Sequence, residues 1–150
     1  MKLVLSVILA FLLFSGASGQ NWKKGLAVAG YHMSTVVVGA LGDAYNDEGQ
    51  KDLGHALKAV EVGMLVSGPF LYKWAFKEYP DFLLYCSVYP MMRFAAYDGI
   101  YNATRDLPLL YNGESSHYDR FMNNFPDAGK AWYKTMVFGL GIGISIKYTD

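Results

Sequence analysis

The stretch DFLLYCSVYPMMRFAAYDGIYNATR, residues 81–105, carries more structural information than any other part of the chain. It has an Asp, Tyr or Arg at every fourth position, and apolar side chains occupy most of the positions between them. A step of four residues advances about 400° around an α-helix, so these side chains form one slanted stripe. The stretch therefore predicts a long, mostly apolar helix that starts at Pro80-Asp81 and runs toward Asn102, with Pro90 inside it.

Three polar residues, Arg93, Asp98 and Asn102, lie well inside this predicted helix. Burying a charged side chain costs several kcal/mol unless the charge is paired. In a membrane setting such residues face protein or water and mark a functional site by default. Two interpretations stay open: these residues fix the packing against neighbouring helices, or they meet a ligand or a protein partner. The candidate ligand or partner residues are Arg93, Asp98, Tyr101 and Asn102.

The first part of the chain after residue 20 is also expected to be helical. Small and apolar residues recur at every fourth position from Gly25, which favours a helix over residues 25–42. The β-branched run at residues 35–38 would also suit a strand. Residues 42–49, GDAYNDEG, predict a turn of solvated acidic residues.

The next segment predicts a helix that proline interrupts. Asp52 is expected to cap a helix from Leu53 to about Ser67. Gly68-Pro69 is expected to kink or end that helix. Residues 70–77 then continue it or form a short helix of their own.

The last third predicts a loop and two helices. Residues 106–113 read as the loop, and Ser116 is expected to cap a short helix that runs through Asn124. The final helix is expected over residues 128–146. Residues 140–148 alternate apolar with small or polar side chains, so a terminal strand is the competing interpretation for the tail.

The N-terminal segment Met1–Gly19 predicts a cleaved signal peptide. Lys2 precedes an apolar run, and small residues close the segment at Ala17-Ser18-Gly19. The apolar run would span about 18 Å as a helix, short of the roughly 30 Å of a bilayer core. We therefore expect residues 1–19 to be a signal peptide and residues 20–150 to be a single domain.

Composition restricts the classes of function. The chain has 150 residues, 13 basic and 13 acidic, so its net charge is zero and a nucleic-acid partner is not expected. Cys86 is the only cysteine, which leaves no internal disulfide and no cysteine-based zinc site. We expect no cofactor.

Histidine and aspartate residues supply the catalytic candidates. The chain has three histidines, and none lies in a metal-binding spacing such as HExxH. A fold that brings His32 and His55 together with Asp98 would form a site where a metal could activate water. The alternative is that each histidine makes only local hydrogen bonds.

A longer motif carries a family resemblance. Arg93-Phe94-x-x-x-Asp98-x-x-Tyr101-Asn102 is followed by Leu107-Pro108 and then by Tyr111-x-Gly113-x-x-Ser116-x-x-Asp119-Arg120. The pattern resembles that of small bacterial and phage membrane-associated proteins to which no activity is assigned. Glu114 departs from the threonine expected in it. The resemblance implies a compact helical membrane protein and transfers no catalytic residue.

These observations predict an all-α protein, a compact bundle of about four to five helices that is embedded in or attached to a membrane. The leading function is a structural or interaction role in the cell envelope, with membrane lipid and a protein partner or second copy as candidate partners. One alternative is an intramembrane metal-dependent hydrolase that acts on lipid or envelope substrates. The other is a soluble periplasmic or secreted binding domain with a tyrosine-lined pocket.

Overall fold

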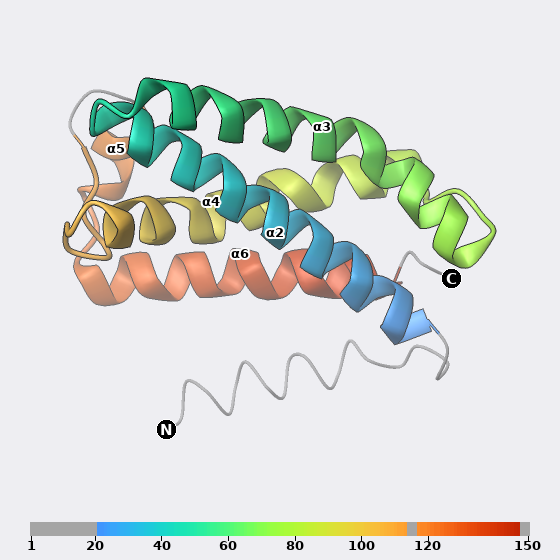
Figure 1. Cartoon of the computed structure of the whole chain (residues 1–150). Helices are drawn as coiled ribbons and strands as arrows, with labels where there is room; N and C mark the ends of the chain where they lie inside the picture. Colours follow the sequence, from blue (N-terminus) through green and yellow to red (C-terminus); the bar gives the residue numbers. More distant parts are fainter. Residues whose placement is uncertain (1–20, 114–116, 148–150) are drawn as a thin grey trace.

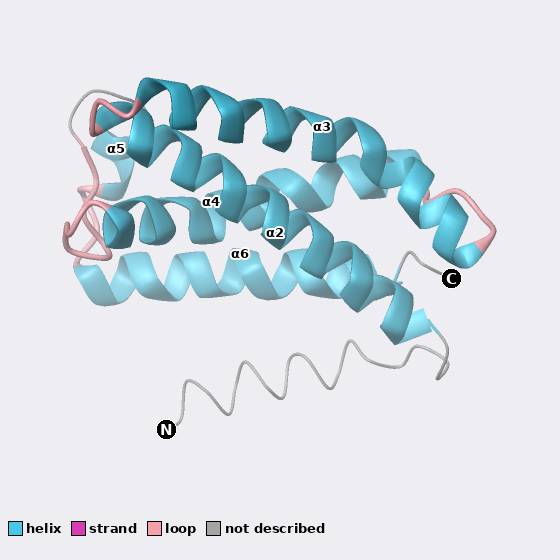
Figure 2. Cartoon of the chain, in the orientation of Figure 1, coloured by secondary structure: helices cyan, strands magenta, loops and turns pink. Residues whose placement is uncertain are grey.

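A computed structural model describes residues 21–113 and 117–147, and all regular structure in these ranges is helical (Figures 1 and 2). Four long helices lie side by side, and one short helix sits at the end of the bundle where α2 meets α3. The predicted helical bundle is thus confirmed for the described part of the chain. The helices are α2 (Asn21–Asp47), α3 (Lys51–Phe76), α4 (Phe82–Thr104), α5 (His117–Met122) and α6 (Asp127–Lys147).

Helix α2 is the central element of the bundle. It packs against α3, α4 and α6, and α4 also packs against α6. Val36, Val88 and Met92 are fully buried between α2 and α4. Phe138 and Ile142 of α6 pack against the same cluster. The apolar core therefore lies along α2, and α3 covers it from the other side (Figure 1).

Helix α2 confirms the expected helix over residues 25–42 and extends past it. The predicted turn over residues 42–49 is wrong for most of its length, because the helix continues to Asp47 and turns only at Glu48–Gln50. Tertiary contacts explain the difference: Asp43 pairs with Lys58 of α3, and Asp47 accepts a hydrogen bond from Tyr101 of α4. The acidic residues therefore line a helix face and do not form a solvated loop.

Helix α3 is one continuous helix through Pro69. Its N-cap is Gln50, without a side-chain hydrogen bond, so Asp52 lies in the first turn and is not the cap. Gly68 is required by close packing, because the Tyr85 hydroxyl occupies the place of any added Cβ. At the other end, Lys77 closes the helix in the left-handed conformation, and its N–H donates to the Lys73 carbonyl at 2.8 Å.

The C-terminal segment is helical up to Lys147, so the strand interpretation of residues 140–147 is wrong. Close packing of α6 against α2 and α4 explains two of the glycines at these contacts. A Cβ on Gly25 would lie 2.5 Å from the Ile146 Cα, and one on Gly141 would lie 3.1 Å from the Met92 methyl. The predicted signal peptide, the Ser116 cap and Tyr148 lie outside the described residues.

The described residues distribute polarity in an unusual way. Glu61 and Lys134 are only 4% and 7% exposed, whereas Trp74 and Leu83 are 76% and 77% exposed. In a protein folded in water, charged groups are almost never fully buried unless paired, and large apolar patches on the surface are rare. The bundle therefore holds charge inside and presents apolar surface outside.

Candidate functional site

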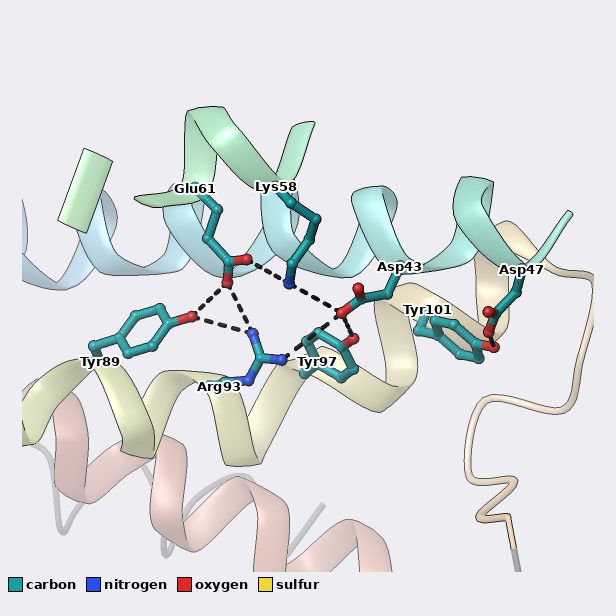
Figure 3. A network of polar contacts seen from close by, with 8 residues as sticks. All are labelled: Asp43, Asp47, Lys58, Glu61, Tyr89, Arg93, Tyr97 and Tyr101. Atoms are coloured by element: carbon teal, nitrogen blue, oxygen red, sulfur yellow. Dashed lines mark hydrogen bonds and ion pairs between the residues drawn. The ribbon is translucent and has the colours of Figure 1, made fainter. Parts of the chain in front are cut away.

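A network of charged and phenolic side chains joins three helices (Figure 3). We call it the α2–α3–α4 network. Its residues on α4 follow the stripe at every fourth position that the sequence predicts, and they meet residues of α2 and α3. The members are Asp43, Asp47, Lys58, Glu61, Tyr89, Arg93, Tyr97, Tyr101 and Arg105.

Glu61 of α3 is the most buried charge of the network. Its carboxylate accepts hydrogen bonds from Tyr89 Oη at 2.5 Å and from Arg93 Nη1 at 2.9 Å, both on α4. Lys58 Nζ lies 2.6 Å from its second oxygen. Hydrogen bonds to ionised groups are stronger than neutral ones, and three of them offset much of the cost of burying this charge. Gly39 of α2 makes room for the carboxylate, which occupies the space of a missing Cβ.

Asp43 brings α2 into the same network. Lys58 Nζ lies 3.1 Å and Arg93 Nη2 lies 3.9 Å from its Oδ2, and Tyr97 donates a hydrogen bond to that oxygen. Lys58 and Arg93 thus each lie between Asp43 and Glu61 (Figure 3). The inner part of the network contains two carboxylates and two cations, so its net charge is zero.

The outer part of the network reaches the surface near the end of α4. Tyr101 donates to Asp47, and Arg105 Nη1 donates to Tyr101 Oη at 2.6 Å. The Tyr97 and Tyr101 rings stack with an interplanar angle of 10°, and the Arg93 guanidinium lies 4.1 Å from the Tyr97 ring centroid. Aromatic and cation–π contacts therefore join the inner and outer parts.

A second polar cluster lies between α4, α5 and α6. Asp98 Oδ2 accepts hydrogen bonds from Lys134 Nζ at 2.5 Å and from Tyr118 Oη at 2.9 Å. Burial, together with the Asp98 charge, raises the pKa of Tyr118, which keeps its hydroxyl a neutral donor. The charges of Asp98 and Lys134 cancel, so this cluster is neutral as well.

The predicted group of Arg93, Asp98 and Asn102 is not one cluster. Arg93 faces α2 and α3, whereas Asp98 faces α5 and α6. Five residues on a helix advance about 500°, which leaves the two side chains roughly 140° apart. Asn102 has a different role from Arg93 and Asp98. Its Nδ2 donates a hydrogen bond to the Tyr111 carbonyl at 2.8 Å and so fixes the loop that follows α4.

The histidine and aspartate candidates for a metal site are also apart. His32 is buried on α2, with its ring 4.3 Å from the Tyr85 ring. His55 is exposed next to Gly54, where α3 meets Asn46, about 21 Å further along α2. Asp98 is bound by Lys134. Within the described ranges, no three His, Cys, Asp or Glu side chains are grouped as metal ligands.

Sequence reasoning identified Arg93 but missed its partners Asp43, Lys58 and Glu61. The available signal was Glu61 itself, an isolated carboxylate in the apolar run AVEVGMLVSG, with Lys58 three residues before it. A similar signal was present on α6, where Lys130 and Lys134 are one turn apart in a mostly apolar helix.

No protein-family model, no curated protein and no solved structure matches this chain. Chemically, both clusters consist of charges that already have partners inside the protein. Such an arrangement orders and orients helices relative to one another.

Proposed function

We propose that this chain is a small membrane-embedded helical bundle of the cell envelope with a structural or interaction role, in which the α2–α3–α4 network fixes the packing. The observation that carries the proposal is the inverted distribution of polarity along single helices. On α3, Glu61 is buried while Val62, Val66, Phe70 and Trp74 face outward.

The free energy of that outer face differs between water and hydrocarbon. In water, each exposed apolar side chain forgoes about 25 cal/mol for every Å² left unburied. In hydrocarbon the same surface carries no such cost, whereas an unpaired charge costs several kcal/mol. A bundle that buries paired charges and exposes Val66 and Phe70 is therefore better suited to lipid than to water.

The helix lengths fit a bilayer. α6 has 21 residues and α2 has 27, which correspond to about 31 and 40 Å at 1.5 Å per residue. The hydrocarbon core is about 30 Å thick. Among the described helices, one is long and apolar enough to cross a membrane by length and composition alone, namely α2 over Trp22–Asp47. Half of its most apolar 18-residue segment is buried in the bundle. The core helix of a soluble protein meets the same criteria, so the proposal rests on the outer faces of α3, α4 and α6.

Neither alternative function gains a specific observation. A hydrolase built on His32, His55 and Asp98 would need these residues to meet. For a tyrosine-lined binding pocket, the tyrosine stripe of α4 was the candidate lining, but Tyr89, Tyr97 and Tyr101 donate their hydroxyls to carboxylates. The structural role uses the network as it stands.

Fractionation of the expressed full-length chain tests the proposal. We expect the protein in a membrane fraction that resists carbonate at high pH and dissolves in mild detergent. An intact mass that matches a chain starting near Gln20 would also support the predicted cleavage of the signal peptide. A monomeric protein recovered in the aqueous fraction without detergent would contradict membrane embedding, whatever its mass.

A further inference from the structure

One end of the bundle gathers lysines, and we call it the lysine end. Three chain segments meet there: the start of α2, the connection from α3 to α4, and the end of α6 (Figure 1). The ion pair between Lys24 and Glu78 joins the first two segments, and the contact of Gly25 with Ile146 joins the first to the third. Its lysines are Lys23, Lys24, Lys73, Lys77 and Lys147.

The lysine end also exposes aromatic and apolar side chains. Trp74 and Phe70 project from the last turns of α3, and Phe82 and Leu83 from the first turn of α4. Lys73 Nζ lies 4.0 Å from the ring centroid of the exposed Tyr79. Trp and Tyr next to Lys are typical of the boundary between a bilayer and water, where rings sit at headgroup level and ammonium groups reach the phosphates.

Charge is segregated between the two ends of the bundle. Among the described residues, the lysine end has five lysines and two carboxylates, Glu78 and Asp81. The opposite end, residues 47–52 with the described part of 105–130, has six carboxylates and four Lys or Arg residues. Among the described residues, the two ends of the bundle therefore carry net charges of opposite sign.

We infer that the lysine end binds the headgroups of anionic phospholipids. This inference rests on the proposed membrane embedding and adds a lipid class and an orientation to it. Positive charge selects anionic headgroups, and the exposed rings of Trp74 and Tyr79 place that charge at headgroup depth. The acidic end repels the same headgroups, so the bundle is expected to direct its lysine end toward the more anionic leaflet.

Tryptophan quenching by spin-labelled lipids tests the inference. The chain has three tryptophans, and a Trp132→Phe background leaves Trp22 in the first turn of α2 and Trp74 in the last turn of α3, both at the lysine end. The protein is reconstituted in phosphatidylcholine vesicles with equal small fractions of spin-labelled phosphatidylglycerol or phosphatidylcholine. We expect phosphatidylglycerol to quench more strongly, with a preference of up to about fivefold for each lysine in contact with headgroups. The preference should fall in 1 M salt.

Matched variants separate this site from overall charge. Lys73→Gln/Lys77→Gln removes two exposed charges at the lysine end and should reduce the preference several-fold. Lys51→Gln/Arg120→Gln removes two exposed charges at the opposite end and should leave it unchanged. Equal quenching by both lipids in the parent, or equal losses in the two variants, would overturn the lipid preference while leaving embedding intact. Quenching by neither lipid would instead contradict the proposed membrane embedding.

Discussion

Glu61 is the residue at which burial and charge conflict most strongly. It is 4% exposed and relies on Lys58, Tyr89 and Arg93 for compensation. Removing one partner from a buried ion pair leaves the other charges uncompensated and costs about 3–5 kcal/mol. We expect Glu61→Gln to lower the free energy of unfolding by this amount, measured by denaturant titration in mild detergent.

Two further variants make the Glu61 prediction specific. Glu48→Gln changes an exposed carboxylate in the turn between α2 and α3 and should alter stability by no more than about 0.5 kcal/mol. Replacing Lys58, Glu61 and Arg93 together by apolar residues should recover most of the loss, because no charge is then left unpaired. An effect of Glu61→Gln no larger than that of Glu48→Gln would show that the network does not hold the helices.

A double-mutant cycle tests the separation of the two clusters. Glu61 and Asp98 share no partner and lie on opposite sides of α4. The stability losses of Glu61→Gln and Asp98→Asn should therefore add within about 0.5 kcal/mol. Glu61→Gln and Arg93→Gln should be strongly non-additive in the same assay. A large coupling energy between positions 61 and 98 would contradict the separation and indicate one connected cluster, as the sequence suggested.

For single residues, the sequence identifies which polar side chains lie inside the helices but not which partners they contact. The stripe from Tyr85 to Arg105 could be predicted because helical spacing is a local property. Whether Asp98 meets Arg93 or Lys134 depends on which helices flank α4, and that is a property of the whole bundle. Glu61 could be found only by asking why a carboxylate interrupts an apolar run.

At the scale of elements, close approach between helices depends on particular glycines. In α2, a methyl group on Gly39 would collide with the Glu61 carboxylate, which three hydrogen-bonded partners hold in place. Gly30 on the same helix has nothing within 4 Å of an added Cβ. We expect Gly39→Ala to cost about 1–3 kcal/mol through overpacking. Gly30→Ala should be neutral or add up to about 1 kcal/mol through helix propensity.

Thermal or denaturant unfolding of the two glycine variants checks this pair of expectations. Both substitutions are Gly→Ala inside one helix, so helix propensity changes the free energy of unfolding by a similar amount in each. The difference in stability between the two variants therefore measures packing. Equal effects would mean that α2 and α3 are further apart at Gly39 than the structure places them.

The elements could be predicted in type more than in extent. Apolar spacing identified α4 and α6 to within a few residues. The turn predicted over residues 42–49 failed because local composition favours a loop, while Lys58 and Arg105 pair with Asp43 and Asp47 on a continued helix. Of the two alternatives for residues 70–77, the structure confirms that they continue α3 past Pro69, and Tyr72 and Phe76 beyond the proline pack against the core.

At the scale of the whole molecule, the inverted polarity is the property that sets this bundle apart. Val66 is 65% exposed, although it lies on the same helix as the buried Glu61. The sequence reveals that α3 is apolar, but not which of its faces is covered. That depends on α2 lying against Gly54 and Glu61, an arrangement that only the assembled bundle specifies.

Thiol accessibility at Val66 tests membrane embedding most directly. In a Cys86→Ser background, Val66→Cys and Gln50→Cys each provide one thiol, on the apolar face and in the α2–α3 turn respectively. In unsealed membranes, a water-soluble maleimide should label position 50 quickly and leave position 66 unlabelled, and both should react after denaturation in SDS. Equally fast labelling at positions 66 and 50 in native membranes would place the apolar face of α3 in water and contradict membrane embedding.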